Sequence, residues 1–272
     1  MSVVAKTGQV AISRDRHGGR FWRRFASYGF ARDRHSVPVV LAELEPAASA
    51  FPLVFCRTGT GGIAPHALLH LTTGAPSPFV TQDGTWRGTY VPSILRAYPF
   101  AATPAREGDE MALLVDESSG LITDTPEDEP FFDDSGAPSA ALEQVIAFFR
   151  TRAQSELATQ TACAALQAAG LLSPLTPLPG MGESDAAGLL TLDTATLDAL
   201  DTAALPDLWT SGALRLAHAQ RVSLCHAGWM ARALRAGSDL APRATGPSPA
   251  DTNLSGFLDA LSEAQYHDRG AH

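Results

Sequence analysis

Short apolar runs, separated by glycine and proline, dominate the chain between residues 37 and 115. Runs of this length bounded by turn residues are typical of β-strands. The turn QDGTW contains Asp83 and Gly84, a pair that favours a hairpin because glycine adopts a positive φ without steric cost. The pattern therefore predicts a strand-rich portion over residues 1–135. The runs read as strands are VPVVLAEL, FPLVFC, ALLHL, PFV, TYVPSIL and MALLV.

The hydrophobic period changes after residue 138. Residues 116–138 are acidic and rich in turn formers, so we expect them to connect two portions of different structure. Ser139 then stands in a suitable N-cap position, and apolar residues recur at helical spacing as far as Gly170. This predicts one long amphipathic helix. Its apolar positions include Leu142, Val145, Ile146 and Phe149.

The rest of the chain is predicted to be mainly helical. GLLTLD is typical of a short strand. A helix is expected to open at Thr194 and continue through LPDLWTSG, and a second helix is expected over residues 214–234. The sequence thus predicts an α+β protein, in which a β-rich portion (1–135) packs on a mainly helical portion (136–235) and the two share one core.

Residues 236–272 are expected to form a linker and a terminal helix. The linker is rich in proline, glycine and serine, and the terminal helix spans about residues 254–266. A short helix with one apolar stripe needs a surface to cover it, so we expect it to dock on the chain's own helical portion or in a homodimer. The stripe consists of Leu254, Phe257, Leu258 and Leu261.

Composition and charge narrow the class of protein. The 272 residues are 45% hydrophobic, which supplies ample apolar material for a core. The net charge is −9, which argues against nucleic acid as a partner. Basic residues nevertheless cluster near the N-terminus, and part of this cluster is a candidate for a local anion-binding patch. The cluster comprises Arg14, Arg16, Arg20, Arg23, Arg24, Arg32 and Arg34.

The cysteines and the lack of long apolar stretches indicate where in the cell the protein is located. Cys56, Cys163 and Cys225 are odd in number and widely spaced, which argues against a disulfide framework and against structural zinc. No signal peptide follows Met1, and no apolar stretch is long enough to insert into a membrane. We therefore expect a cytoplasmic protein.

Histidines are the first candidates for chemistry. His35 could act as a general base, but the favoured interpretation is that it bonds to the backbone where a strand begins, because Pro38 biases Val37 toward extended geometry. His66 and His70 have the spacing of a metal pair on a helix. On a strand they would lie about 13 Å apart, too far for one ion, so no metal is expected.

Two further segments resemble ligand-binding motifs, one for a dinucleotide and one for calcium, but the sequence around them does not support either function. GTGGIA, residues 59–64, matches a dinucleotide fingerprint, but too few residues follow for the helix that would hold the pyrophosphate, so we expect a turn between strands and no cofactor. The acidic run that begins at Asp124 lacks the spacing of a calcium loop and is interpreted as a solvated loop.

Four tracts together resemble the SapC-like family of bacteria. They are YGFARDRHSVPVVLAELEPAASAFPLVF, DGTWRGTYVPSILRAYPF, FFDDSGAPS and LTLDTATLDAL, and the resemblance covers about residues 17 to 235. The family is named from a surface-layer protein secretion locus, and its relatives occur near flavoproteins similar to tryptophan halogenases and near cupin-like oxygenases. The resemblance implies handling of a peptide or protein, but it supplies no catalytic residues.

The resemblance and the residues together favour a non-catalytic accessory protein that binds a peptide or protein client in secretion or peptide modification. The alternative is an enzyme, or an enzyme subunit, that works with a flavoprotein or iron oxygenase on a peptide residue. The expected client-binding residues are Trp86, Tyr90, Arg96 and Tyr98, with His35 as a further candidate, because aromatic and cationic side chains suit peptide recognition. The same aromatic residues could instead form a purely structural cluster.

Overall fold

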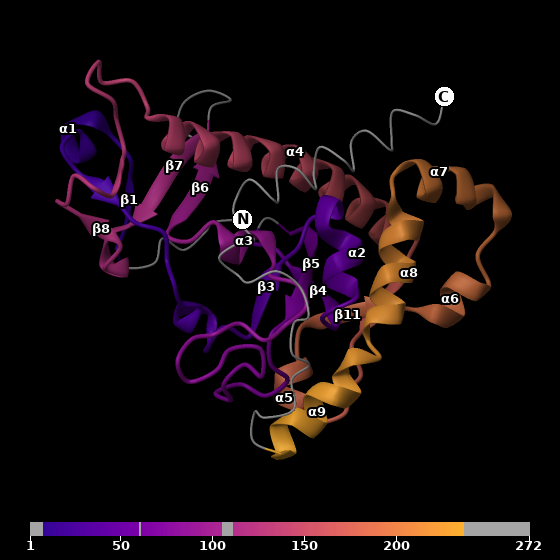
Figure 1. Cartoon of the computed structure of the whole chain (residues 1–272). Coiled ribbons are helices and arrows are strands. Elements are labelled where there is room, and N and C mark those ends of the chain that lie inside the picture. The colour runs from indigo at the N-terminus through magenta and orange to yellow at the C-terminus, as the bar shows by residue number, and fades with distance from the viewer. Residues whose placement is uncertain (1–7, 60, 105–110, 237–272) are drawn as a thin grey trace. The chain divides into compact units, whose positions relative to one another are not determined.

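The computed structural model describes residues 8–59, 61–104 and 111–236 (Figure 1). Contacts divide them into two compact units, each discontinuous in sequence. The first unit comprises residues 8–26 and 96–153, and the second comprises residues 27–95 and 154–236. The boundaries fall within helix α3 (Ser93–Arg96) and within the long helix α4 (Ala140–Ala168). The expected terminal helix and its linker lie outside the described residues.

The first unit contains two small antiparallel sheets. One has the order β1 (Gln9–Ala11), β7 (Met111–Asp116), β6 (Phe100–Pro104). The other has the order β8 (Ile122–Thr123), β2 (Phe21–Trp22), β9 (Glu129–Pro130), and the short helix α1 (Arg14–His17) precedes β2. The segment expected to be only a connector thus supplies two strands, because β2 offers a hydrogen-bonding edge to each of them.

Aromatic rings form the core of the first unit. Trp22 meets Phe100 edge-on with 4.8 Å between ring centroids, and Phe100 lies 6.3 Å from Phe131 in the same geometry. All three side chains are buried. Edge-to-face pairs of this kind add to the free energy gained by burial alone.

The second unit is built on a five-stranded antiparallel sheet. Its order is β10 (Leu172–Pro174), β11 (Leu189–Leu192), β4 (Leu53–Arg57), β5 (Ile63–Leu68), β3 (Ser36–Pro38). Strands β4 and β5 form a hairpin whose turn contains the glycines of the GTGGIA segment, and the last two residues of that segment begin β5. Gly61 in that turn has a φ of 86°, a conformation that L side chains rarely adopt. The prediction of a turn between strands is confirmed.

Helices cover part of this sheet. Helix α8 (Ala213–Ser223) packs against β4 and β11, and α2 (Leu44–Ala48) and α7 (Leu205–Thr210) pack against α8. Gln220 and Ser223 of α8 are fully buried. The helix is therefore attached to the sheet by polar as well as apolar side chains. The remaining helical elements of this unit are the 3₁₀ turns Gly29–Ala31, Leu41–Glu43 and Thr202–Ala204 and the helices α5 (Glu183–Ala186), α6 (Thr194–Asp198) and α9 (His226–Ala236).

Several predicted elements are confirmed and others are wrong. Helix α4 begins after Ser139, whose hydroxyl accepts from Leu142 N at 3.1 Å as an N-cap does. The helix expected over residues 214–234 is broken between α8 and α9. The helix expected from Thr194 does open there, with Asp193 as its N-cap, but it ends at Asp198, and a new 3₁₀ turn starts after the cap at Asp201. The α+β class itself is confirmed. No helix within the described ranges is long and apolar enough to cross a membrane.

Two runs predicted as strands are partly helical. VPVVLAEL continues from β3 into the 3₁₀ turn that starts at Leu41, and TYVPSIL contains α3. In both cases the carboxylate of Glu43 bonds to backbone N–H groups at the start of the helical turn, those of Val40 and Ser93. Such capping stabilises a helix beginning that apolar content alone does not reveal.

Candidate functional site

Glu43 is a buried carboxylate at the centre of a hydrogen-bond network. Only 1% of it is exposed. Its Oε2 accepts from the Tyr90 hydroxyl and from Ser93 N, both at 2.7 Å, and its Oε1 accepts from the Ser93 hydroxyl at 2.8 Å. Val40 N also donates to Oε1 at 3.3 Å. The carboxylate therefore fixes the loop that carries Tyr90 and Ser93 to the turn after β3.

Trp86, expected to bind a client, lies in the interior of the second unit. It is 4% exposed, and its ring stacks on Phe79 at 5.8 Å and lies 5.3 Å from Tyr28. Its indole N–H donates to the carbonyl of Tyr90 at 2.9 Å. The structure thus brings Trp86 and Tyr90 together, as the sequence suggested, but it places the indole where a client could not reach it without a rearrangement.

Arg96 and Tyr98 belong to the first unit. Both are half-buried, and the ring of Tyr98 lies 6.1 Å from that of Phe25. Their part in client binding stays a prediction.

The side chain of His35 contacts that of His70. The two Nδ1 atoms lie 3.3 Å apart, and the rings meet edge-on with centroids 4.8 Å apart. One Nδ1 donates and the other accepts, so the contact suits two neutral imidazoles. Burial lowers the pKa of both histidines; the charge of His70 lowers the pKa of His35 further, while Asp185 opposes the shift.

His66 and His70 do not share a site. His66 lies in β5, where its Nδ1 is 3.1 Å from the Ser36 hydroxyl, whereas His70 follows the strand and faces His35. Within the described part of the chain, no group of three histidine, cysteine or carboxylate side chains is placed to hold a metal ion. The two histidines have helical spacing in the sequence, but they do not lie on a helix: His66 is in β5 and His70 follows it.

The first unit carries a surface pocket of about 490 Å³. Arginine and phenylalanine side chains from the N-terminal segment face the loop after β9 there. The sequence offered two separate signals for this site, the arginine cluster and the tract FFDDSGAPS, but it did not show that they meet. The pocket is lined by Arg14, Gly18, Arg20, Phe21, Pro130, Phe132, Asp133, Asp134 and Gly136.

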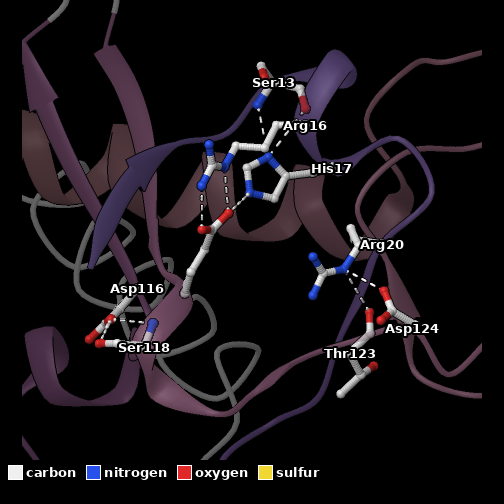
Figure 2. Close-up of polar contacts among 9 residues, drawn as sticks. Ser13, Arg16, His17, Arg20, Asp116, Ser118, Thr123 and Asp124 are labelled. Atoms are coloured by element: carbon white, nitrogen blue, oxygen red, sulfur yellow. Dashed lines mark hydrogen bonds and ion pairs between the residues drawn. The ribbon is translucent and has the colours of Figure 1, made fainter.

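Most of the neighbouring arginines are already engaged (Figure 2). Arg16 holds both carboxylate oxygens of Glu117 at 2.7 Å. The Nε of Arg20 lies 2.6 Å from a carboxylate oxygen of Asp124, and it also donates to the Thr123 carbonyl. The side chain of Arg14 differs, since its guanidinium has no hydrogen bond or ion pair with another described residue.

His17, beside these arginines, has a structural position. It is 1% exposed, its ring lies 5.0 Å from that of Phe131, and its Nε2 is 3.3 Å from Glu117 Oε1. Its Nδ1 is 3.3 Å from both the N and the O of Ser13. Burial lowers its pKa, so near neutral pH it is an uncharged member of the core that orients Glu117 toward Arg16.

Comparison with known proteins gives one family match. The family model described as SapC matches residues 12–228, which is most of the chain and includes the residues of the pocket and of the Glu43 network. No curated protein and no solved structure matches the chain.

Proposed function

The chain belongs to the SapC family, and from this premise we propose that it is a non-catalytic accessory protein that binds a peptide or protein client. The client would be handled in bacterial secretion or peptide modification, in the cytoplasm. The observation that supports this proposal is the pocket of the first unit, which offers apolar rings and a guanidinium at the surface.

The size and lining of the pocket suit a peptide segment. A volume of about 490 Å³ falls within the range of small-molecule sites and would take one or two side chains with their backbone. Three rings of the lining are half-buried, so each packs on the protein on one side and is exposed to solvent on the other; they belong to Phe21, Pro130 and Phe132. Rigid aromatic groups and arginine are the side chains that most often dominate protein interfaces.

Binding rather than turnover is supported by how the reactive groups are used. Glu43 accepts four hydrogen bonds that organise the fold, and His35 and His70 face each other. Burial raises the pKa of the Cys56 thiol to about 11 and that of Cys163 to about 12, which keeps both protonated at neutral pH. These groups are engaged in structure, whereas the pocket is open.

The test is reconstitution with the native client. The protein is purified under mild conditions from its host, the co-purifying chain is identified by mass spectrometry, and the purified pair is titrated by calorimetry. We expect Phe132→Ala to weaken binding at least tenfold. Leu157→Ala, which removes an apolar side chain that is 64% exposed and outside the pocket, should leave binding unchanged.

The enzyme alternative has a different signature in the same preparation. Flavin absorbance, stoichiometric iron or chemical modification of the client by the purified chain would overturn the non-catalytic proposal. Equal binding by wild type and Phe132→Ala would overturn the assignment of the client to this pocket.

A further inference from the structure

We propose that the pocket of the first unit recognises a peptide segment in which a carboxylate stands next to an aromatic side chain, with Arg14 receiving the carboxylate. This inference rests on the proposed client-binding function and names the chemistry of the client. Three observations carry it: the guanidinium of Arg14 has no described acceptor, the lining also contains two carboxylates, and the rings of Phe21 and Phe132 are fixed by backbone pairing.

Arg14 is exposed, and its guanidinium packs against the loop after β9 without being neutralised. Its guanidinium lies against Gly136, so closely that a Cβ at that position would overlap its Cζ. Gly136 has a φ of 80°, which glycine adopts freely. No described acceptor takes a hydrogen bond from Arg14, although a guanidinium has five N–H donors. A guanidinium that lies at the pocket wall and has no described acceptor is available to bind an anion bidentately.

The charge balance of the lining selects a singly charged group. Arg14 and Arg20 contribute two positive charges, and Asp133 and Asp134 contribute two negative charges. The Ser135 hydroxyl and two backbone N–H groups bond to Asp133, which lowers the pKa of that carboxyl and keeps it ionised. Because Arg20 is already paired with Asp124, two carboxylates stand beside Arg14 in the lining, which disfavours a phosphate dianion or a polyanion, while one carboxylate can still pair with Arg14.

The two rings are held by backbone pairing rather than by mobile loops. Phe21 lies in β2, where it is paired with Thr123 on one side and with Pro130 on the other. Phe132 forms an isolated antiparallel bridge with Pro138. Because little conformational entropy is lost when rings supported in this way receive a ligand, an aromatic side chain is the natural complement of this wall.

The ligand side is tested with matched blocked tetrapeptides. The first contains phenylalanine followed by aspartate, the second replaces aspartate with asparagine, and the third replaces phenylalanine with alanine. Dissociation constants are measured by calorimetry with inorganic phosphate as a competitor. We expect the asparagine peptide to bind about 10- to 100-fold more weakly, the range for losing a charge-assisted hydrogen bond. The alanine peptide should also bind more weakly, and phosphate should not compete.

The protein side is tested with variants that keep the fold. Arg14→Gln should bind the aspartate and asparagine peptides equally, while Arg23→Gln, an exposed arginine outside the lining, should behave as wild type. Gly136→Ala should reproduce the loss because it displaces the guanidinium. Its matched control is Gly120→Ala, because Gly120 has a similar φ of 70° and an added Cβ there would meet no atom within 4 Å. Both alanines strain the backbone, and only the first disturbs Arg14.

The outcomes separate this inference from the proposed function. Equal affinity of wild type for the aspartate and asparagine peptides, or effective competition by phosphate, would overturn the carboxylate assignment. Absence of binding by every tetrapeptide at millimolar concentration would overturn the ligand class. In either case, a client lost in Phe132→Ala would still support client binding at the pocket, while a client that binds this variant normally would remove the pocket from both proposals.

Discussion

At the scale of single residues, the Glu43 network accounts for two polar side chains of the tract YVPSILRAYPF, those of Tyr90 and Ser93. Its tyrosine and serine are specified by one buried carboxylate that lies 47 and 50 positions earlier in the chain. A sequence without structure shows the two tracts as separate motifs, because nothing local to Tyr90 reveals its acceptor. The hydrogen-bond partner of Tyr90 could therefore not be predicted, and the part of these aromatic residues in client binding stays a prediction.

A double-mutant cycle measures this network. Tyr90→Phe removes a hydrogen bond to a carboxylate and should lower the free energy of unfolding by about 1.5 to 3 kcal/mol. The same change in a Glu43→Gln background should cost less, because the acceptor charge is already gone. Urea denaturation of the four proteins gives the coupling free energy. Strictly additive effects would show that the hydroxyl and the carboxylate do not interact.

The His35–His70 pair predicts a pH dependence of stability. Burial lowers the pKa of both rings in the folded state, so the unfolded chain binds more protons as the pH falls through about 6.5. Stability is therefore full above that value and decreases below it. The groups around the pair that oppose this shift are Asp33 and Asp185.

Denaturation at pH 7.5 and at pH 5.5 checks the sign. His70→Gln should reduce the loss of stability between these values, whereas His218→Gln, at an exposed histidine of α8, should leave it unchanged. A loss that is the same in His70→Gln as in wild type would assign the pH dependence to other groups.

At the scale of elements, period and capping identified the long helix and the hairpin but missed the shortest helices. Helix α4 and strand β4 have strong local patterns and form where they were predicted, whereas β5 (Ile63–Leu68) begins four residues before the predicted run ALLHL. Helix α2 and α3 are each five residues or fewer, and the N–H groups at Val40 and Ser93 are bonded by a distant or neighbouring carboxylate. Helices this short, stabilised by such contacts, show no helical repeat of apolar residues, so the sequence pattern cannot predict them.

Gln220 provides a test of how α8 is attached to the sheet. It is fully buried, its Nε2 donates to Leu53 O at 3.1 Å and to Thr191 Oγ1 at 3.0 Å, and its Oε1 accepts from Leu192 N at 3.3 Å. Gln220→Leu keeps the volume but removes these bonds, so it should lower the free energy of unfolding by about 2 to 6 kcal/mol, the sum for two buried backbone groups that lose a partner. Thermal and urea unfolding measure the change.

The matched control for that substitution is Gln160→Leu, at an exposed position of α4. It should change stability by less than about 0.5 kcal/mol, as is usual for surface sites. A small effect of Gln220→Leu would mean that apolar contacts alone attach α8.

At the scale of the whole molecule, the division by contacts differs from a division by composition. Strand β1 pairs with β7, and β2 pairs with β8 and β9, although about a hundred residues separate the partners. The same pairing brings Arg14 and Phe21 to the loop that contains Asp134 and Gly136. Composition gave the class of fold and named the arginine cluster, but only long-range strand pairing creates the pocket, and no local pattern encodes it.

The three thiols report on the integrity of the whole fold. All are free, but Cys163 is buried, Cys56 is partly buried and Cys225 is exposed. With a pKa of about 11, Cys56 is ionised at pH 8 in only about a thousandth of the molecules, and the thiolate is the reactive form. We therefore expect a colorimetric disulfide reagent to modify one thiol rapidly in the folded protein and three in denaturant. Cys225→Ser should abolish the rapid reaction. A second rapid thiol in the folded variant would show that the sheet around Cys56 opens readily, which would contradict a stable second unit.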